Sequence, residues 1–525
     1  MKKIRFSSHK AIALFLAFVL FAATAIPASA ADADTSDATR FVFSDSGITV
    51  TEGAYTGYKV KDTALSLTAA GTYIVSGSCK NGTIVVKKNV TGVTLVLDGL
   101  TLSASATAPI TCNKGSGVTI SAAAGTVNNL ADDQYNNDDI YTDETLYPDI
   151  ENAVIKCKDG SNVTIAGTGT INVTSNGKNG VKGGYDLYEE DAEGNATDTL
   201  LSTASLTIRD VTLNITANVN DALKADKELN ILSGTVTVSA PDDGIKSDYT
   251  LNIGESGTAG PTIKVTKAAE GIEGSVVNVY SGKVYVTASD DGVNAANGDI
   301  AERSTQFSYN QYGGYVYINV SNGDGVDSNG SAKLTGGTLE VHAPAQGDGD
   351  PIDTEYGCTF GGATVLAVGH AAMQQAYTAS TPYVVFGGNA GGRPGGFGGM
   401  FGGGQTNLVT AGSAIQITDA SGNVLYSATA VRNASYVLFA SPDLTSGASC
   451  TLKNGSTAVS TATAGTASSG NPGSPQDPGV PGDRPTLPGG TNDDTQNLTP
   501  IGVLRMIWNV IRSFFIRIYN WFTQR

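Results

Sequence analysis

Charged residues and histidine are scarce in this 525-residue chain. Charged side chains make up 15 % of the sequence, against about 25 % in typical globular domains. Of the three histidines, His9 lies in an expected leader segment, while His342 and His370 stand alone in the sequence. A histidine-centred catalytic triad or a zinc enzyme is therefore poorly supported, and solvated or core histidines are the favoured interpretation.

Cysteine is also too infrequent to provide a framework of disulfide bonds. The number is odd and the spacings are not those of a zinc site, so the residues cannot all pair with one another. The five positions are Cys79, Cys112, Cys157, Cys358 and Cys450. We predict that disulfides do not hold the fold together.

Positive charge is outnumbered by negative charge, with 32 basic against 49 acidic residues. The segment of the first thirty residues has four basic residues, an apolar run from Ala11 to Ile26 and an Ala-Ser-Ala stretch ending at Ala30, which is the pattern of a secretory signal peptide. Its removal takes the formal net charge from −17 to −21. Such a chain repels nucleic acid over most of its surface. We predict a secreted protein at the extracellular cell surface, with no nucleic-acid partner.

Glycine is abundant, with 65 residues, and short alternating strands recur instead of helical periodicity. Strands such as Leu206 to Ile208, Leu229 to Ile231, Leu251 to Ile253 and Val277 to Val279 begin 22 to 26 residues apart. This interval is typical of a solenoid. The pattern predicts an all-β parallel β-helix, with polar insertions as loops.

Aligning the coils gives an aliphatic column and, two residues later, a column of small residues. The aliphatic column is Ile110, Ile155, Val181, Leu223, Ile245, Ile272, Val293, Val326 and Ile352. The small column includes Cys112 and Cys157, whose stacked side chains would point the same way and make poor disulfide geometry. We expect two inward ladders, with free thiols favoured over a disulfide.

Charged residues flank the aliphatic column on both sides, in two columns that we expect to face outward. In early coils acids have lysine neighbours, as in Asp221 with Lys224 and Asp243 with Lys246. From Glu270 onward carboxylates face carboxylates about 5 Å apart, which favours a bound cation such as calcium. The candidate ligands are Glu270, Glu273, Asp290, Asp291, Asp324, Asp327, Asp350 and Asp353. The alternative is that Asp-Gly only makes a turn, which does not explain the loss of lysine.

Tyrosines gather with acids in the insertions. Tyrosine can stack on a sugar ring while its hydroxyl bonds sugar hydroxyls, although loop anchoring is an equal explanation for any one of them. Together with lysines of the charge columns, they give these candidate carbohydrate-binding residues: Lys182, Lys224, Lys246, Tyr135, Tyr141, Tyr188 and Tyr312.

The stretch IENAVIKCKDGSNVTIAGTGTINVTSNGKNGVKGG, the later DDGIKSD and GGTLEVHA, and the closing SYVLFASPDLTSGASCTL together resemble a family of exported carbohydrate-binding β-helix proteins. The resemblance covers about residues 40 to 455. It implies the right-handed, pectate-lyase-like parallel β-helix of the polysaccharide-lyase superfamily, calcium in the turns, and binding of cellulose or pectin-type acidic sugars. It also implies that Lys182, Lys224 and Lys246 match positions that a lyase could use for uronate contact or proton abstraction.

Four segments are expected: a signal peptide at 1–30, a carbohydrate-binding β-helix domain at 31–455, a Ser/Thr/Gly/Pro-rich linker at 456–500, and an amphipathic basic-aromatic helix at 501–525. The basic and aromatic sides of the last segment favour peripheral membrane contact through Ile501 to Arg525. Docking to a partner and spanning a membrane remain alternatives.

The functional expectation is a calcium-stabilised protein that binds plant-type polysaccharides without catalysis. A calcium-dependent polysaccharide lyase acting by proton abstraction is the first alternative. A cell-surface adhesin or stalk without a defined sugar site is the second.

Overall fold

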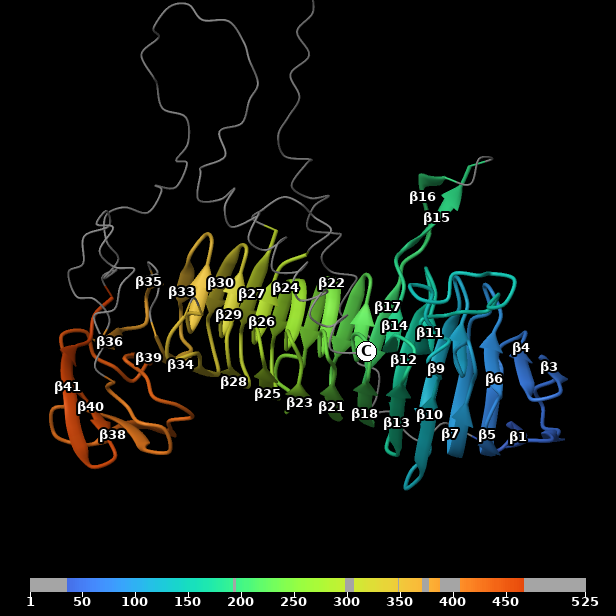
Figure 1. The fold of residues 1–525 in the computed structure, drawn as a ribbon, viewed down its shortest axis with the longest axis horizontal. Coiled ribbons are helices and arrows are strands. Elements are labelled where there is room, and N and C mark those ends of the chain that lie inside the picture. Colours follow the sequence, from blue (N-terminus) through green and yellow to red (C-terminus); the bar gives the residue numbers. More distant parts are fainter. Residues whose placement is uncertain are drawn as a thin grey trace, which may run out of the picture. The chain divides into compact units, whose positions relative to one another are not determined.

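The computed structural model describes residues 35–191, 195–297, 306–347, 349–370, 377–387 and 407–466. All of them lie in one compact unit. Their secondary structure is all β, and no helix occurs in these ranges (Figure 1). No described helix is long and apolar enough to cross a membrane. The predicted signal peptide and the predicted helix at 501–525 lie outside the described residues.

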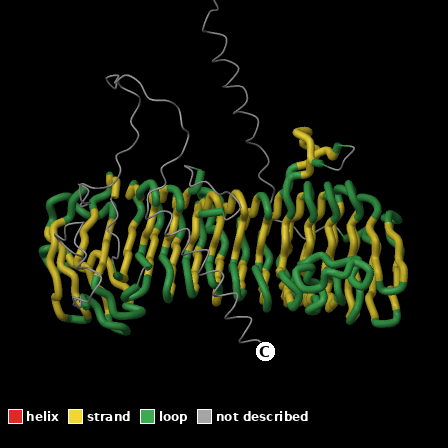
Figure 2. Tube along the Cα trace, turned by 45° about the horizontal axis from the view of Figure 1, so that its top comes forward, coloured by secondary structure: helices red, strands yellow, loops and turns green. Residues whose placement is uncertain are grey.

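Most strands pair in parallel with a strand one coil further along the chain, in three ladders (Figure 2). The first ladder runs through β4 (Ala64–Leu67), β6 (Thr83–Val86), β8 (Ile110–Cys112), β11 (Ala153–Cys157), β14 (Asn179–Gly183), β19 (Leu223–Ala225), β22 (Ile245–Ile253), β24 (Ile272–Val279), β26 (Val293–Ala295), β29 (Val326–Ser328) and β32 (Ile352–Thr354). It contains the aliphatic column expected from the sequence.

The second ladder shares the long strands β22 and β24 with the first. Its other members are β1 (Thr39–Ser44), β5 (Gly71–Cys79), β7 (Val93–Ser103), β9 (Gly117–Ala122), β12 (Asn162–Gly167), β17 (Ser205–Ile208), β20 (Glu228–Ile231), β27 (Ser308–Gln311), β30 (Ser331–Leu334), β33 (Cys358–Phe360) and β35 (Tyr377–Ala379). Asparagines outside the core are also paired between coils, because Asn252 donates to Asn230 at 2.9 Å and Asn278 donates to Asn252 at 3.0 Å.

The third ladder begins where the end of β5 pairs with the end of β7. It continues through β10 (Val127–Ala131), β13 (Thr170–Ser175), β18 (Thr212–Ala217), β21 (Thr235–Ser239), β23 (Thr262–Lys267), β25 (Lys283–Ala288), β28 (Tyr315–Val320), β31 (Thr338–His342) and β34 (Thr364–Gly369). In these strands buried aliphatics alternate with more exposed polar residues, as in β18 with its buried Leu213 and Ile215. The period-two pattern therefore places one face of each strand in a common core.

Antiparallel strands occur at the two ends of the stack and in one insertion. They are β2 (Gly47–Thr51) against β1, β3 (Tyr58–Lys61) against β4, β15 (Leu187–Glu190) against β16 (Ala196–Ser202), β39 (Tyr436–Ala440) against β34 and β36 (Tyr383–Gly387), and a sheet of β38 (Val424–Thr429), β37 (Ala414–Thr418), β40 (Ser449–Asn454) and β41 (Thr457–Thr463). The linker predicted from residue 456 therefore begins too early, because β41 completes the last sheet.

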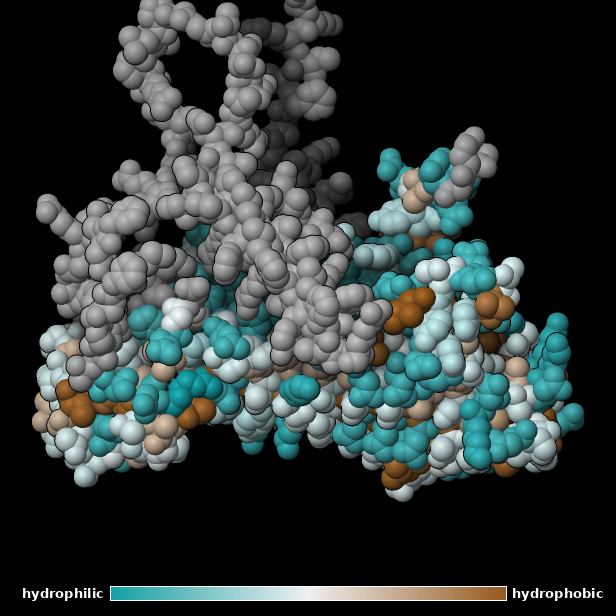
Figure 3. Space-filling model, in the orientation of Figure 1, coloured by the Kyte–Doolittle hydropathy of each residue, from teal (hydrophilic) through white to brown (hydrophobic). Residues whose placement is uncertain are grey.

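The inward columns have the register predicted from the sequence. Ile245, Ile272 and the other aliphatics are at most 2 % exposed and lie opposite one another in consecutive coils. Cys112 lies opposite Cys157, and all five cysteines are buried free thiols. The prediction of a small buried ladder without a disulfide is confirmed. On the side shown in Figure 3 the described surface is mainly hydrophilic, with scattered apolar areas.

Candidate functional site

A column of charged residues runs along the first ladder. Lys182 lies opposite Lys224, and Lys224 lies opposite Lys246. Lys156 precedes them in the same column, and the column then continues through Glu273, Asn294, Asp327 and Asp353. We call these eight residues the charge column. The register confirms the predicted order, and lysines occupy four consecutive coils before any acid appears.

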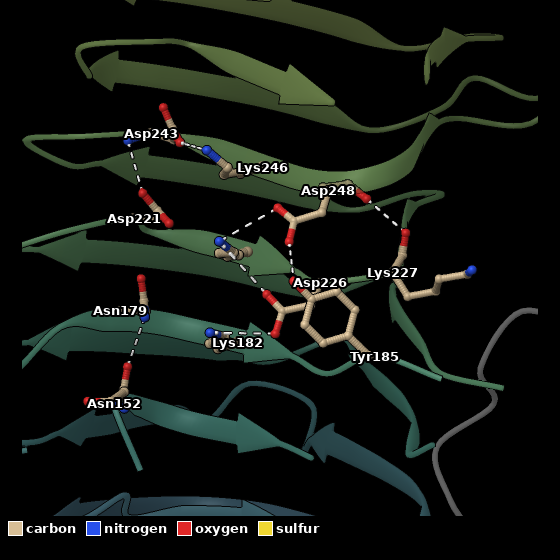
Figure 4. A network of polar contacts seen from close by, with 12 residues as sticks. Asn152, Asn179, Lys182, Tyr185, Asp221, Asp226, Lys227, Asp243, Lys246 and Asp248 are labelled. Carbon is tan, nitrogen blue, oxygen red and sulfur yellow. Dashed lines mark hydrogen bonds and ion pairs between the residues drawn. The ribbon is translucent and has the colours of Figure 1, made fainter. Parts of the chain in front are cut away.

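The middle lysines of the charge column are paired with buried carboxylates (Figure 4). Lys182 Nζ lies 3.5 Å from Asp226, and Lys224 Nζ lies 3.8 Å from Asp226 and 3.6 Å from Asp248. The Tyr185 hydroxyl donates to Asp248 at 3.0 Å. Both aspartates are 5 % exposed. Lys182 and Lys224 are therefore bound to protein carboxylates, which limits what they offer to a sugar.

Four of the acids two residues before the aliphatic column are buried, which corrects the prediction that this column faces outward. Asp221, Asp243, Asp324 and Asp350 are between 2 % and 8 % exposed. Backbone N–H groups of the next coil donate to these side chains: Asp243 to Asp221 at 3.3 Å, Asp324 to Asp291 at 2.7 Å, and Asp350 to Asp324 at 2.6 Å. The next coil covers each carboxylate and brings a donor that needs an acceptor.

The residue that follows each of these acids is usually glycine because the next coil passes too close for a side chain. A Cβ on Gly244, Gly271, Gly292 or Gly325 would lie 2.5 to 2.7 Å from a carbonyl oxygen of the next coil. The Asp-Gly phrase thus has a structural cause without any metal. The close approach of the next coil does not explain how the negative charge of these carboxylates is neutralised.

Asp243, Glu270 and Glu273 each bring a carboxylate oxygen within 4.8 Å of the others. Lys246 Nζ lies 2.8 Å from both Asp243 and Glu273. Lysine is lost from the charge column at Glu273 as predicted, but Lys246 of the preceding coil reaches forward to this coil, so its acids do have a lysine neighbour. One ammonium group does not neutralise three carboxylates. Burial and then Asp243 raise the pKa of Glu270 to about 8 and that of Glu273 to about 9.

Asp324, Asp327 and Asp353 form a second carboxylate cluster, with oxygens within 4.8 Å of one another. Asp327 and Asp353 are register partners on β29 and β32. Burial and then the charge of Asp291 raise the pKa of Asp324 to about 8. An all-oxygen set of carboxylates matches the ligand preference of calcium. Of the two clusters, this one fits the ion better, because the first already contains the Lys246 ammonium group.

The other predicted ligands, Asp290 and Asp291, lie at the preceding turn. A Cβ on Gly323 would come within 2.6 Å of Asp290 Oδ1 and 2.3 Å of Asp291 Oδ1. The missing side chain therefore leaves the space that both carboxylates occupy. The structure brings six of the eight predicted ligands, Asp290, Asp291, Asp324, Asp327, Asp350 and Asp353, to consecutive turns, and it places Glu270 and Glu273 beside Lys246.

The predicted sugar-binding tyrosines lie in three different places. Tyr135 and Tyr141 form a cluster with a third tyrosine of the same insertion, with ring centroids 4.9 to 5.7 Å apart. Tyr188 is on β15 and is 37 % exposed. Tyr312 follows β27 and stacks on Tyr280 with centroids 5.1 Å apart. The structure does not unite these residues in one site.

Lys156 is a candidate that the sequence reasoning missed. Among the described residues its amine makes no ion pair and no hydrogen bond, and its side chain is partly exposed. Burial and then the neighbouring charge of Lys182 lower its pKa. Extending the lysine column back by one coil, to the residue after Ile155, would have found it.

Comparison with models of known protein families identifies the family of this chain. A family model described as "Carbohydrate-binding domain-containing protein" matches residues 61–297 and 191–347. Together these matches span more than half of the chain and include the charge column from Lys156 to Asp327. The chain belongs to this family of carbohydrate-binding domain proteins. No curated protein matches it.

One solved structure that matches is described as "polysaccharide lyase-like protein from C. thermocellum, Gadolinium derivative". The two chains are 19 % identical, and the match covers 62 % of this chain and 93 % of the other, with a TM-score of 0.30. This is a weak likeness.

Proposed function

We propose that this protein is an exported, calcium-stabilised binder of plant-type polysaccharides, either cellulose or acidic pectin-like glycans, and that it does not catalyse a reaction. The family membership supports carbohydrate binding. We also propose that the three ladders wind as a right-handed parallel β-helix. The leader at 1–30 would direct export and would then be removed. At the cell surface, the segment at 501–525 would make peripheral contact with the membrane.

The order of charges in the charge column carries this proposal. Lys156 and Lys182 lie at one end and Asp327 and Asp353 at the other. Six register steps separate Lys156 from Asp327, which is roughly 29 Å at about 4.8 Å per step. An acidic glycan would meet the ammonium group of Lys156 directly. At the acidic end it would need a calcium ion between its own carboxylates and those of the protein.

Calcium would occupy the cluster of Asp324, Asp327 and Asp353. Bound there, the ion would supply positive charge that holds the later coils together. The three residues would contribute oxygen ligands. The backbone N–H of Asp350 donates a hydrogen bond to Asp324 and so orients one of these carboxylates. Binding to the folded state alone would raise the stability of these coils.

The calcium proposal predicts how stability responds to chelator and pH. Without metal, the pKa of Asp324 is raised to about 8 from an ordinary value of 3.8, so the folded state holds a proton that the unfolded state releases. In chelator, the melting temperature should therefore be highest near pH 4 and should fall by a few degrees as the pH rises towards 8. Saturating calcium should reverse the fall at pH 7.5.

The control for this experiment is the double substitution of Asp324→Asn and Asp327→Asn. This variant should respond little to calcium, because two of the three charged ligands are gone. Identical melting curves of the unmodified protein in calcium and in chelator at pH 7.5 would contradict the proposal.

Carbohydrate binding is tested with the mature full chain from Ala31. Retention should be measured by affinity electrophoresis in gels that contain polygalacturonate and calcium, and by depletion on insoluble cellulose. Lys156→Met should weaken binding to polygalacturonate about tenfold, since an ionic hydrogen bond is lost. Lys158→Met is the matched control, because Lys158 already pairs with Glu151 at 2.7 Å. If the Lys156 variant binds polygalacturonate as strongly as the unmodified protein, Lys156 is not part of the carbohydrate-binding site.

The same experiments separate the two alternatives. A lyase is the second candidate, since the lowered pKa of the Lys156 amine favours a general base. Ultraviolet absorbance from unsaturated product in polygalacturonate and calcium would replace the non-catalytic proposal with that one. Failure to bind any glycan would instead favour an adhesin or stalk.

A further inference from the structure

Five tyrosines lie on two consecutive coils, away from the charge column. They belong to the sequences VYSGKVYV and QYGGYVYI and are Tyr280, Tyr285, Tyr312, Tyr315 and Tyr317. β25 and β28, which carry three of them, are paired in the third ladder, whereas the charge column runs along the first. The tyrosines thus define a separate surface, which we call the tyrosine face.

The strand pattern explains why these rings point out of the core. Val284 and Val316 are buried at 0 % and 1 % exposure, so the alternating residues Tyr285 and Tyr317 lie on the other side of the sheet. Tyr285 lies directly opposite Tyr317 in the parallel register. Both rings are only partly covered.

The rings are held in place by one another and by a polar cluster. The Tyr285 ring centroid lies 5.9 Å from that of Tyr315 and 6.4 Å from that of Tyr317. The Tyr315 hydroxyl donates to Glu340 at 3.1 Å, and the Tyr317 ring lies 5.5 Å from that of His342. These contacts fix ring orientation before any ligand arrives, which reduces the entropy lost on binding.

The hydroxyls of Tyr285 and Tyr317 are left available. Within the described residues neither makes a hydrogen bond, whereas the Tyr315 hydroxyl is used by Glu340. At the neighbouring turn Tyr280 and Tyr312 stack with an interplanar angle of 12°, and Tyr312 is 48 % exposed. The face therefore combines partly exposed aromatic surface with unused hydroxyl groups.

This combination matches the two sides of a hexose ring. A pyranose presents C–H groups on its flat face, which pack on an aromatic ring, and hydroxyls around its rim, which bond phenolic oxygens. Recognition by stacking needs no charge on the ligand. On the preceding coils, the register partners of Tyr285 and Tyr315 are Lys264 and Lys283. The neighbours of these two rings in that direction are therefore lysines and not acids.

We propose that the tyrosine face binds the rings of an uncharged glycan by stacking on Tyr285 and Tyr317, with Tyr280 and Tyr312 extending the contact. This inference rests on the proposed carbohydrate-binding function. It is supported by the family match at 191–347, which contains all five tyrosines. The charge column and the tyrosine face would then select charged and uncharged glycans separately.

The test compares variants of the mature full chain by affinity electrophoresis in gels with hydroxyethyl cellulose and, separately, with polygalacturonate and calcium. Combined Tyr285→Ala and Tyr317→Ala should weaken binding to hydroxyethyl cellulose at least tenfold and leave binding to polygalacturonate unchanged. Combined Tyr285→Phe and Tyr317→Phe should keep stacking and lose only the hydroxyl contribution. Tyr249→Ala is the control, because Tyr249 is 41 % exposed and packs under Lys227 instead.

The outcomes distinguish this inference from the proposed function. If the unmodified chain binds hydroxyethyl cellulose and the double alanine variant binds it equally, the tyrosine face is not the site, while carbohydrate binding stands. If the chain binds polygalacturonate alone, the inference is also overturned. If it binds neither glycan, the proposed function fails as well. Urea unfolding of each variant, with an unchanged midpoint, shows that a loss of binding is not a loss of fold.

Discussion

Replacing Lys246 with methionine should destabilise the protein by about 3–5 kcal/mol, because it leaves the buried side chains of Asp243 and Glu273 without their ammonium partner. The Lys246 side chain is 22 % exposed, and its partners Asp243 and Glu273 are 4 % and 9 % exposed. Solvent therefore screens the interaction little. Methionine keeps most of the volume and removes only the charge, so denaturant unfolding reports the ionic contribution.

Two comparisons make the Lys246 result interpretable. Lys80→Met removes a partner of Asp45 at 3.9 Å in a pair whose side chains are 90 % and 59 % exposed, and its effect should be no more than a slight one. Adding Glu273→Gln to the Lys246 variant should restore part of the loss, since one of the two acids left without the ammonium partner is removed. A Lys246 variant as stable as the unmodified protein would show that this lysine is not needed for the fold and would return it to the candidate sugar contacts.

Gly271→Ala should cost about 3 kcal/mol, since overpacking forces the backbone to shift. The new Cβ would lie 2.2 Å from Val286 Cγ1 and 2.5 Å from the carbonyl oxygen of Gly292. That oxygen belongs to the neighbouring coil and accepts the N–H of Ile272. Movement away from the methyl group would therefore stretch a hydrogen bond between coils. Denaturant midpoints measure the loss.

Gly274→Ala is the matched control within the same coil. Its Cβ would lie 3.3 Å from its nearest neighbours, and the same column already holds Ala225 and Ala295. The expected change is within about 1 kcal/mol. Equal losses for both substitutions would contradict the view that the close approach of the next coil, and not glycine in general, is what position 271 requires.

The columns of the first ladder were predictable because a coil is a local unit repeated along the chain. Ile245, Ile272 and the residues after them could be aligned from spacing alone, and parallel pairing then placed them opposite one another. Charge partners were less predictable. Asp243 does pair with Lys246, but Lys224 pairs with Asp226 and Asp248 instead of Asp221. A lysine side chain spans more than one coil, so its partner depends on distances that spacing does not give.

Some of the candidate site was beyond sequence reasoning for the same reason. Whether Asp324 is buried, and which N–H it accepts, depends on how the next coil covers the turn. The tyrosine face depends on Tyr285 meeting Tyr317 across coils whose strands begin 32 residues apart, at Lys283 and Tyr315. Within the charge column, Lys156 is the one lysine without an ion pair among the described residues, and this is apparent only once the partners of the other three are known.

The amino-acid sequence by itself determined the all-β coils, their inward columns and the separation of lysines from acids, because each follows from alternation and spacing within a short stretch of chain. Only the tertiary structure decided which charges are neutralised, which carboxylates are buried and which aromatic rings share a surface. Those properties depend on contacts between successive coils, where distance and burial set the strength of every electrostatic interaction.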